Sequence, residues 1–122
     1  MTRMEHQKKI ISDMKKVGTY KPQFRIAVQA LAQIMEDYDR TLEEFLEGGE
    51  QVIIEYTNKA GATNEAKNPL YLALETLRKQ ILDYLRELGL TPAGLKKINE
   101  DQLKGKKASG KLSSALENLD AL

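Results

Sequence analysis

The sequence predicts a mainly α-helical fold. Two long antiparallel helices are joined by a short β-hairpin, with a basic N-terminal helix before them and a short C-terminal helix and flexible tail after them. Two observations carry this prediction. Two long segments repeat apolar residues at alternating spacings of four and three, the rhythm of a single helix face. Between them, a short run of β-branched residues is followed by a turn sequence, which favours a hairpin.

Composition suits one folded domain. Of 122 residues, 41% are apolar and 30% charged. We expect a helical domain over 1–98 and a flexible basic linker with a short amphipathic tail over 99–122. No apolar run is long enough to cross a membrane and no signal-peptide core is present, so we expect a protein that is not secreted and has no membrane partner. The absence of cysteine excludes disulfides and thiolate metal sites.

A basic amphipathic helix is expected over residues 2–16, and Gly18 ends it with a short turn. A helix, a tight turn and a second helix form the outline of a helix-turn-helix, although many helical domains share it. One side of this first helix is apolar and the other is basic. The apolar side holds Ile10, Ile11, Met14 and Val17, and the basic side holds Lys8, Lys9, Lys15 and Lys16.

The first long helix is expected from the turn containing Pro22 to Glu47, before a glycine pair. The second is expected to begin after Asn68, a good N-cap, with Pro69 in the first helical position, and to end at Gly89. Each helix carries an apolar seam, and further apolar residues beside each seam make the stripe wider than one pairing can bury, so we expect a homo-oligomer. The seams are Phe24, Val28, Leu31, Met35, Tyr38, Leu42 and Phe45 on the first helix, and Leu70, Leu74, Leu77, Ile81, Tyr84 and Leu88 on the second.

Smaller elements complete the chain. Residues 50–67 are expected to form the hairpin, with a turn over 58–61. Thr91 and Pro92 repeat the cap-plus-proline pattern and begin a short helix. The polar segment over 99–111 is typical of a linker. The residues that follow resume an amphipathic rhythm and offer a possible partner contact through Leu112, Leu116 and Leu119.

Charge is distributed unevenly although the net charge is only +1. Residues 1–25 carry seven basic and two acidic groups, a local charge of +5, and residues 26–50 carry one basic and seven acidic groups, a local charge of −6. Lysine and arginine side chains neutralise DNA phosphates, so the basic segment is the preferred DNA contact, and a solvated helix face is the alternative. The candidate DNA-binding residues are Lys8, Lys9, Lys15, Lys16, Lys21 and Arg25; a second, weaker cluster is Lys104, Lys106, Lys107 and Lys111.

The linear order of the boundary motifs resembles one family of phage terminase small subunits. That order is a long helix, a glycine-rich stop, a short hairpin, Asn68-Pro69, a second long helix, and Leu-Gly-Leu-Thr-Pro over 88–92. The resemblance covers residues 20–98. The family commonly follows Thr-Pro with two small residues and an arginine, and this chain instead has Leu95 behind its small pair, with Lys96 next to it.

The resemblance implies a non-enzymatic packaging factor. Such a protein would assemble into a ring, bind double-stranded viral DNA, and regulate the terminase large subunit, which carries the ATPase and nuclease. It would act in the cytoplasm of the bacterial host. Two alternatives stay open on the residues alone: a dimeric helix-turn-helix transcriptional regulator, and a coiled-coil adaptor that does not bind DNA. Oligomer size and DNA binding at low salt separate the three.

No enzyme is expected. The acidic run that includes Glu36, Asp39 and Glu43 is interpreted as a solvated helix face, which a neighbouring subunit's basic helix is able to pair with, rather than as a metal site. His6 is the single histidine, so neither a zinc site nor a catalytic triad is expected, and we interpret it as a surface residue. A phosphate-binding glycine loop is also missing, and we expect no cofactor.

Overall fold

The computed structural model describes residues 1–105 and consists of a helical hairpin flanked by two further helices. Its elements in chain order are α1 (Arg3–Val17), a 3-10 turn (Pro22–Phe24), α2 (Arg25–Glu47), β1 (Ile53–Thr57), β2 (Thr63–Lys67) and α3 (Pro69–Glu87). A last helix begins at residue 92 and is helical through 105.

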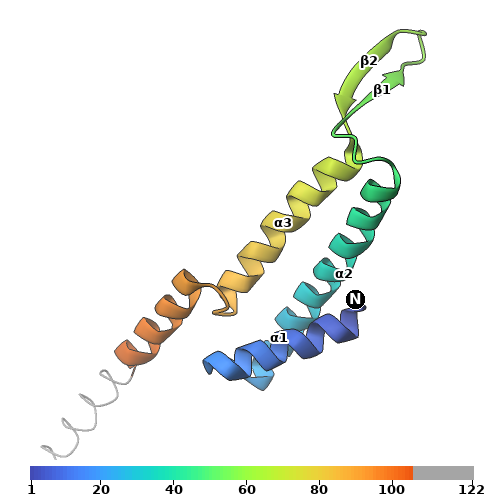
Figure 1. Cartoon of the computed structure of the whole chain (residues 1–122). Helices are drawn as coiled ribbons and strands as arrows, with labels where there is room; N and C mark the ends of the chain where they lie inside the picture. Colours follow the sequence, from blue (N-terminus) through green and yellow to red (C-terminus); the bar gives the residue numbers. More distant parts are fainter. Residues whose placement is uncertain (106–122) are drawn as a thin grey trace, which may run out of the picture.

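The elements form an elongated molecule (Figure 1). Helices α2 and α3 run antiparallel and side by side, the two strands extend from one end of this pair, and α1 crosses α2 near the other end. The helix over 92–105 continues beyond the end of α3, away from the β-hairpin. The predicted fold class, mainly helical with two long helices joined by a short antiparallel hairpin, is therefore confirmed.

Two boundaries differ from the sequence prediction. The first long helix opens with a 3-10 turn at Pro22, and its α-helical part begins only at Arg25. Residues 99–105 are helical, not linker. Their polarity suggested a linker, yet most are good helix formers, and a solvated helix that continues from Pro92 accommodates them with every side chain exposed.

Local chemistry explains the helix ends. The Asn68 side chain accepts a hydrogen bond from the Leu70 amide at 3.0 Å and donates one to the Gln51 carbonyl at 2.9 Å, so it caps α3 and ties it to the chain entering the hairpin. Gly18 and Gly89 take left-handed conformations with φ of 79° and 72° and end α1 and α3. The Thr91 hydroxyl accepts from the Gly94 amide at 3.1 Å and caps the last helix.

The core lies where α1, the first half of α2 and the end of α3 meet. Ile10 and Met14 of α1 pack with Val28 and Leu31 of α2 and with Leu88 just after α3. Burying each of these side chains contributes about 1.5–3 kcal/mol, so this junction holds the three helices together. The other residues of the two seams are buried or half-buried, apart from the exposed Phe24 at the 3-10 turn.

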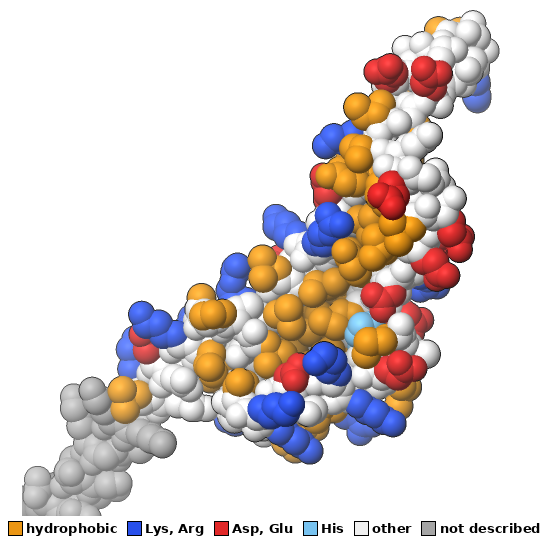
Figure 2. Space-filling model, viewed as in Figure 1, with side chains coloured by type: hydrophobic (Ala, Val, Ile, Leu, Met, Phe, Trp, Pro, Cys, Tyr) orange, Lys and Arg blue, Asp and Glu red, His pale blue; other side chains and the backbone are white. Residues whose placement is uncertain are grey.

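Within residues 1–105, no element other than α1 forms a third layer on the helical pair. Figure 2 shows apolar side chains gathered in a band along the long axis of the molecule. Leu46, Leu72 and Leu82, which are three of the residues that widen the seams, are about half exposed. The hairpin exposes apolar side chains as well, including Ile53 and Tyr56. Within residues 1–105, no helix has both the length and the apolar character needed to span a membrane.

Candidate nucleic-acid interface

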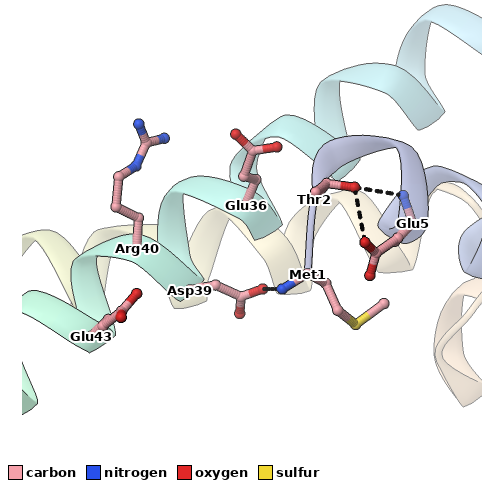
Figure 3. Close-up of a pocket in the computed structure, with 7 residues that line it drawn as sticks. All are labelled: Met1, Thr2, Glu5, Glu36, Asp39, Arg40 and Glu43. Carbon is pink, nitrogen blue, oxygen red and sulfur yellow. Dashed lines mark hydrogen bonds and ion pairs between the residues drawn. The ribbon is translucent and has the colours of Figure 1, made fainter.

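The beginning of α1 is fixed on the acidic side of α2. The Arg3 amide donates a hydrogen bond to the Glu36 carboxylate, and the His6 ring nitrogen lies 2.7 Å from an Asp39 carboxylate oxygen. Figure 3 shows Thr2 and Glu5 beside these α2 residues around a shallow hollow. Carboxylates are favourable near the positive end of a helix dipole, so part of the acidic run serves to dock α1 within the same chain.

His6 therefore corrects a sequence interpretation. Its side chain is only 12% exposed and is held by Asp39, so it is not a simple surface residue. The contact was not visible in the sequence because its two partners are separated by 33 positions and meet only through tertiary packing.

Docking of α1 in this orientation directs its lysines to solvent. Ile10 and Met14 face the core, whereas Lys8, Lys9, Lys15 and Lys16 are all exposed. Three of these lysines, Lys8, Lys15 and Lys16, line one shallow hollow together with Ile11 and Ser12. Such an arrangement offers several ammonium groups on one face to a phosphate backbone.

The remaining basic candidates are less uniform. The Lys9 ammonium lies 3.4 Å from the Asp13 carboxylate in an exposed i,i+4 pair, which leaves it less available than its neighbours. The Lys15 ammonium lies 5.3 Å from the centre of the Tyr20 ring, a contact that positions it at the turn after α1. Lys21, just before the 3-10 turn, and Arg25, the first residue of α2, are both exposed.

Arg78 is a positioned cation that the sequence gave no reason to select. Its Nε donates to the Tyr38 hydroxyl at 3.2 Å, and its guanidinium lies 5.7 Å from the centre of the same ring. The hydrogen bond to Tyr38 raises the pKa of Arg78 above its ordinary value. It links α3 to α2 across the seam.

No described part of the chain resembles a metal centre, because no group of three or more His, Asp or Glu side chains in residues 1–105 is arranged to hold an ion. Asp37 is already engaged by Arg40 at 2.6 Å and by Gln33 at 3.1 Å. Lys104 is exposed at the end of the described chain. The other members of the second lysine cluster and the predicted partner contact, Lys106, Lys107, Lys111, Leu112, Leu116 and Leu119, lie outside the described residues.

The described residues therefore form a helical protein with an exposed lysine face on α1 and exposed apolar side chains beyond the core. The family model described as phage terminase, small subunit, matches residues 5–104, and the chain belongs to that family. The matched residues include most of α1, which lies outside the segment 20–98 that the boundary motifs covered. Proteins of this family are generally regulatory and DNA-binding rather than catalytic. No curated protein and no solved structure matches the chain.

Proposed function

We propose that this small subunit assembles into a ring, binds the viral DNA to be packaged through α1, and regulates the terminase large subunit in the host cytoplasm. The observation that supports DNA binding most directly is the solvent-facing lysine set of α1, which lies inside the family match. Phosphate contacts of this kind supply affinity without reading sequence. A ring raises the overall affinity for DNA above that of one subunit, because several subunits bind one duplex at once.

Assembly is favoured by the apolar surface that the single chain leaves exposed. Leu46, Leu72 and Leu82 lie on the helical pair, and the two-stranded hairpin has few neighbours of its own. An isolated hairpin is marginal in water, so contact with another copy would stabilise it. Light scattering of the purified chain is expected to give a mass well above that of a tetramer, whereas a dimer would favour an operator-binding regulator.

The DNA contact is tested by a triple substitution, Lys8→Gln with Lys15→Gln and Lys16→Gln. For the unmodified protein, the logarithm of affinity is expected to fall with the logarithm of salt at about 0.9 per phosphate engaged. The variant is expected to bind a labelled duplex more weakly and with a slope shallower by about 2–3. Fluorescence anisotropy over a salt series measures both quantities.

The matched control removes the same charge elsewhere. Lys59, Lys67 and Lys79 are exposed and lie off α1, so their triple glutamine variant is expected to keep nearly the original slope. If the two variants lost DNA affinity equally, only net charge would matter, and the proposed α1 site would be wrong. Absence of any binding at low salt would favour the coiled-coil adaptor.

Regulation of the large subunit is assigned to residues 112–122, whose leucine pattern suits a helical contact. A chain ending at residue 111 is expected to assemble normally and to lose its stimulation of the large subunit's ATPase. Unchanged stimulation would refute this assignment.

A further inference from the structure

An apolar groove runs from the core junction onto the last helix. Its first part has a volume of about 690 Å³ and lies where the end of α1, the end of α3 and the start of the last helix meet. Its second part is a hollow along the last helix, which shares Pro92 and Leu95 with the first part and extends to Leu103. Leu103 is 54% exposed, and so is every side chain around it over 99–105 to a similar or greater degree of exposure class. Within residues 1–105, this junction groove is open to solvent.

The residues that follow the described part of the chain have a pattern that suits this groove. Leu112, Leu116 and Leu119 are spaced by four and three, so a helix places them on one side. We refer to residues 112–122 as the leucine tail. A helix of this length is marginal in water on its own, so it needs an apolar surface to form. Insertion of an amphipathic helix into an apolar groove is a common mode of recognition.

The leucine tail starts within reach of the junction groove. Residues 106–111 connect it to the last helix, and an extended linker of this length spans up to about 20 Å. At 1.5 Å per residue, the track from Leu103 back to Pro92 is about 16 Å long. The leucine tail is about equally long as a helix. A chain that reverses direction in the linker, where Gly110 eases a turn, therefore covers the whole track.

The charged side chains of the junction groove are unevenly placed. Lys16 lines its first part and Lys96 its second part, and neither forms an ion pair within residues 1–105. Two carboxylates line the same surfaces. Asp13, in the first part, is already paired with Lys9 at 3.4 Å, and Glu100 lies further along the last helix. The end of the groove near the start of the last helix is therefore its more basic end.

The leucine tail carries the complementary charge in its second half. It contains no lysine or arginine, and its two acids are Glu117 and Asp120. When the tail runs antiparallel to the last helix, Leu112 lies near the far end of the groove and both acids lie toward its basic end. The neutral Ser113 and Ser114 then lie on the side of Glu100. One orientation therefore satisfies both the apolar and the charged groups.

We propose that the leucine tail folds back into the junction groove of its own subunit, where its acids neutralise Lys16 and so weaken DNA binding. Lys16 lines both this groove and the hollow that holds Lys8 and Lys15 on α1. A docked tail occupies a cation that otherwise binds a phosphate. The same leucines serve the proposed contact with the large subunit, so a large subunit that takes the tail releases Lys16. The effect on DNA rests on the proposed function, whereas the docking does not.

The docking is tested with a single tryptophan, because the chain has none of its own. In Leu116→Trp, the emission is expected at short wavelength with weak quenching by acrylamide, since the side chain is shielded from water. Adding Val17→Asn and Leu103→Asn removes apolar surface from the groove without changing its charge. These side chains are 42% and 54% exposed, so the fold is expected to persist, while the emission moves to longer wavelength and quenching increases.

The matched control is Ile26→Asn, which changes an 81% exposed apolar side chain away from the groove and is expected to leave the emission unchanged. A second measurement leaves the tail sequence intact in the reference protein. A chain ending at residue 111 is expected to show faster amide exchange over 95–105, because the last helix loses its cover. Tryptophan that is exposed before any groove substitution, together with unchanged exchange, overturns the docking. Emission that moves to longer wavelength on dilution to single chains places the tail in a neighbour's groove and overturns the assignment to its own subunit.

The salt dependence of DNA affinity tests the second part of the proposal. The chain ending at residue 111 and the chain with Val17→Asn and Leu103→Asn are both expected to have a slope steeper by about 0.9 for each subunit engaged, which corresponds to one more phosphate contact. The groove substitutions leave the net charge unchanged. A steeper slope in the shortened chain alone would therefore mean that the tail acts only through its charge, and the docked inhibition would be wrong. Absence of any DNA binding refutes the proposed function, while the emission measurement still decides the docking.

Discussion

At the scale of single residues, two glycines in the segment 88–94 are required by close packing between the last helix and its neighbours. A side chain at Gly94 would bring its Cβ to 2.1 Å from the Arg86 carbonyl oxygen, so the last helix can lie against α3 only without one. Gly89 has a left-handed backbone, which disfavours any other residue. A Cβ at this position would also come within 2.7 Å of Ile98 and 2.9 Å of Thr19. The sequence predicted the turn at Gly89 from local chemistry. It did not predict the need for Gly94, which arises only from the approach of two helices.

Gly94→Ala is accordingly expected to destabilise the protein. The added methyl group meets backbone atoms that cannot rotate away, so the last helix must shift from α3, at a cost of about 1–3 kcal/mol in the free energy of unfolding. Urea denaturation measures the change. Gly105→Ala is the control, because no atom of the described residues lies within 4 Å of its Cβ position, and it is expected to be neutral or slightly stabilising. Equal stability of the Gly94 variant and the wild type would contradict the tight contact.

At the scale of elements, the sequence predicted where helices begin and end better than how they pack. Thr2, Asn68 and Thr91 act as caps through hydrogen bonds to amides two or three residues away, and such local patterns are visible in the sequence. The docking of α1 was not predicted. It depends on Glu36 and Asp39 lying beside the start of α1, and no local pattern indicates a partner more than 30 residues away.

His6 is expected to be the side chain that holds α1 in register on α2. Its 2.7 Å contact with Asp39 is partly buried, because the His6 side chain is 12% exposed and that of Asp39 is 40% exposed. His6→Ala is therefore expected to lower the free energy of unfolding by about 1 kcal/mol. It is also expected to speed amide exchange in the first turns of α1, because local opening becomes easier. Lys9→Ala removes an exposed pair and is expected to change stability by less than about 0.5 kcal/mol. Similar effects of the two substitutions would contradict this role for His6.

At the scale of the whole molecule, two surfaces are kept apart. The lysine face of α1 and the acidic side of α2 are the same two charge blocks that the sequence separates, and the structure explains why they do not cancel. The beginning of α1 contacts the acids, whereas Lys8, Lys15 and Lys16 are exposed and line a hollow further along α1. Lys16 also lines a second hollow, between the end of α1, the end of α3 and the start of the last helix. The exposure of these lysines was predictable from helical periodicity. The second hollow was not predictable, because it forms only where three separate segments meet.

This separation predicts that DNA binding can be lost without loss of assembly. The α1 glutamine variant removes three ammonium groups whose side chains are exposed, so it is expected to bind DNA weakly while keeping the full oligomer mass. Anisotropy and light scattering on the same samples measure the two properties separately. A glutamine variant that dissociates into smaller species would mean that the lysines of α1 also take part in the contact between subunits.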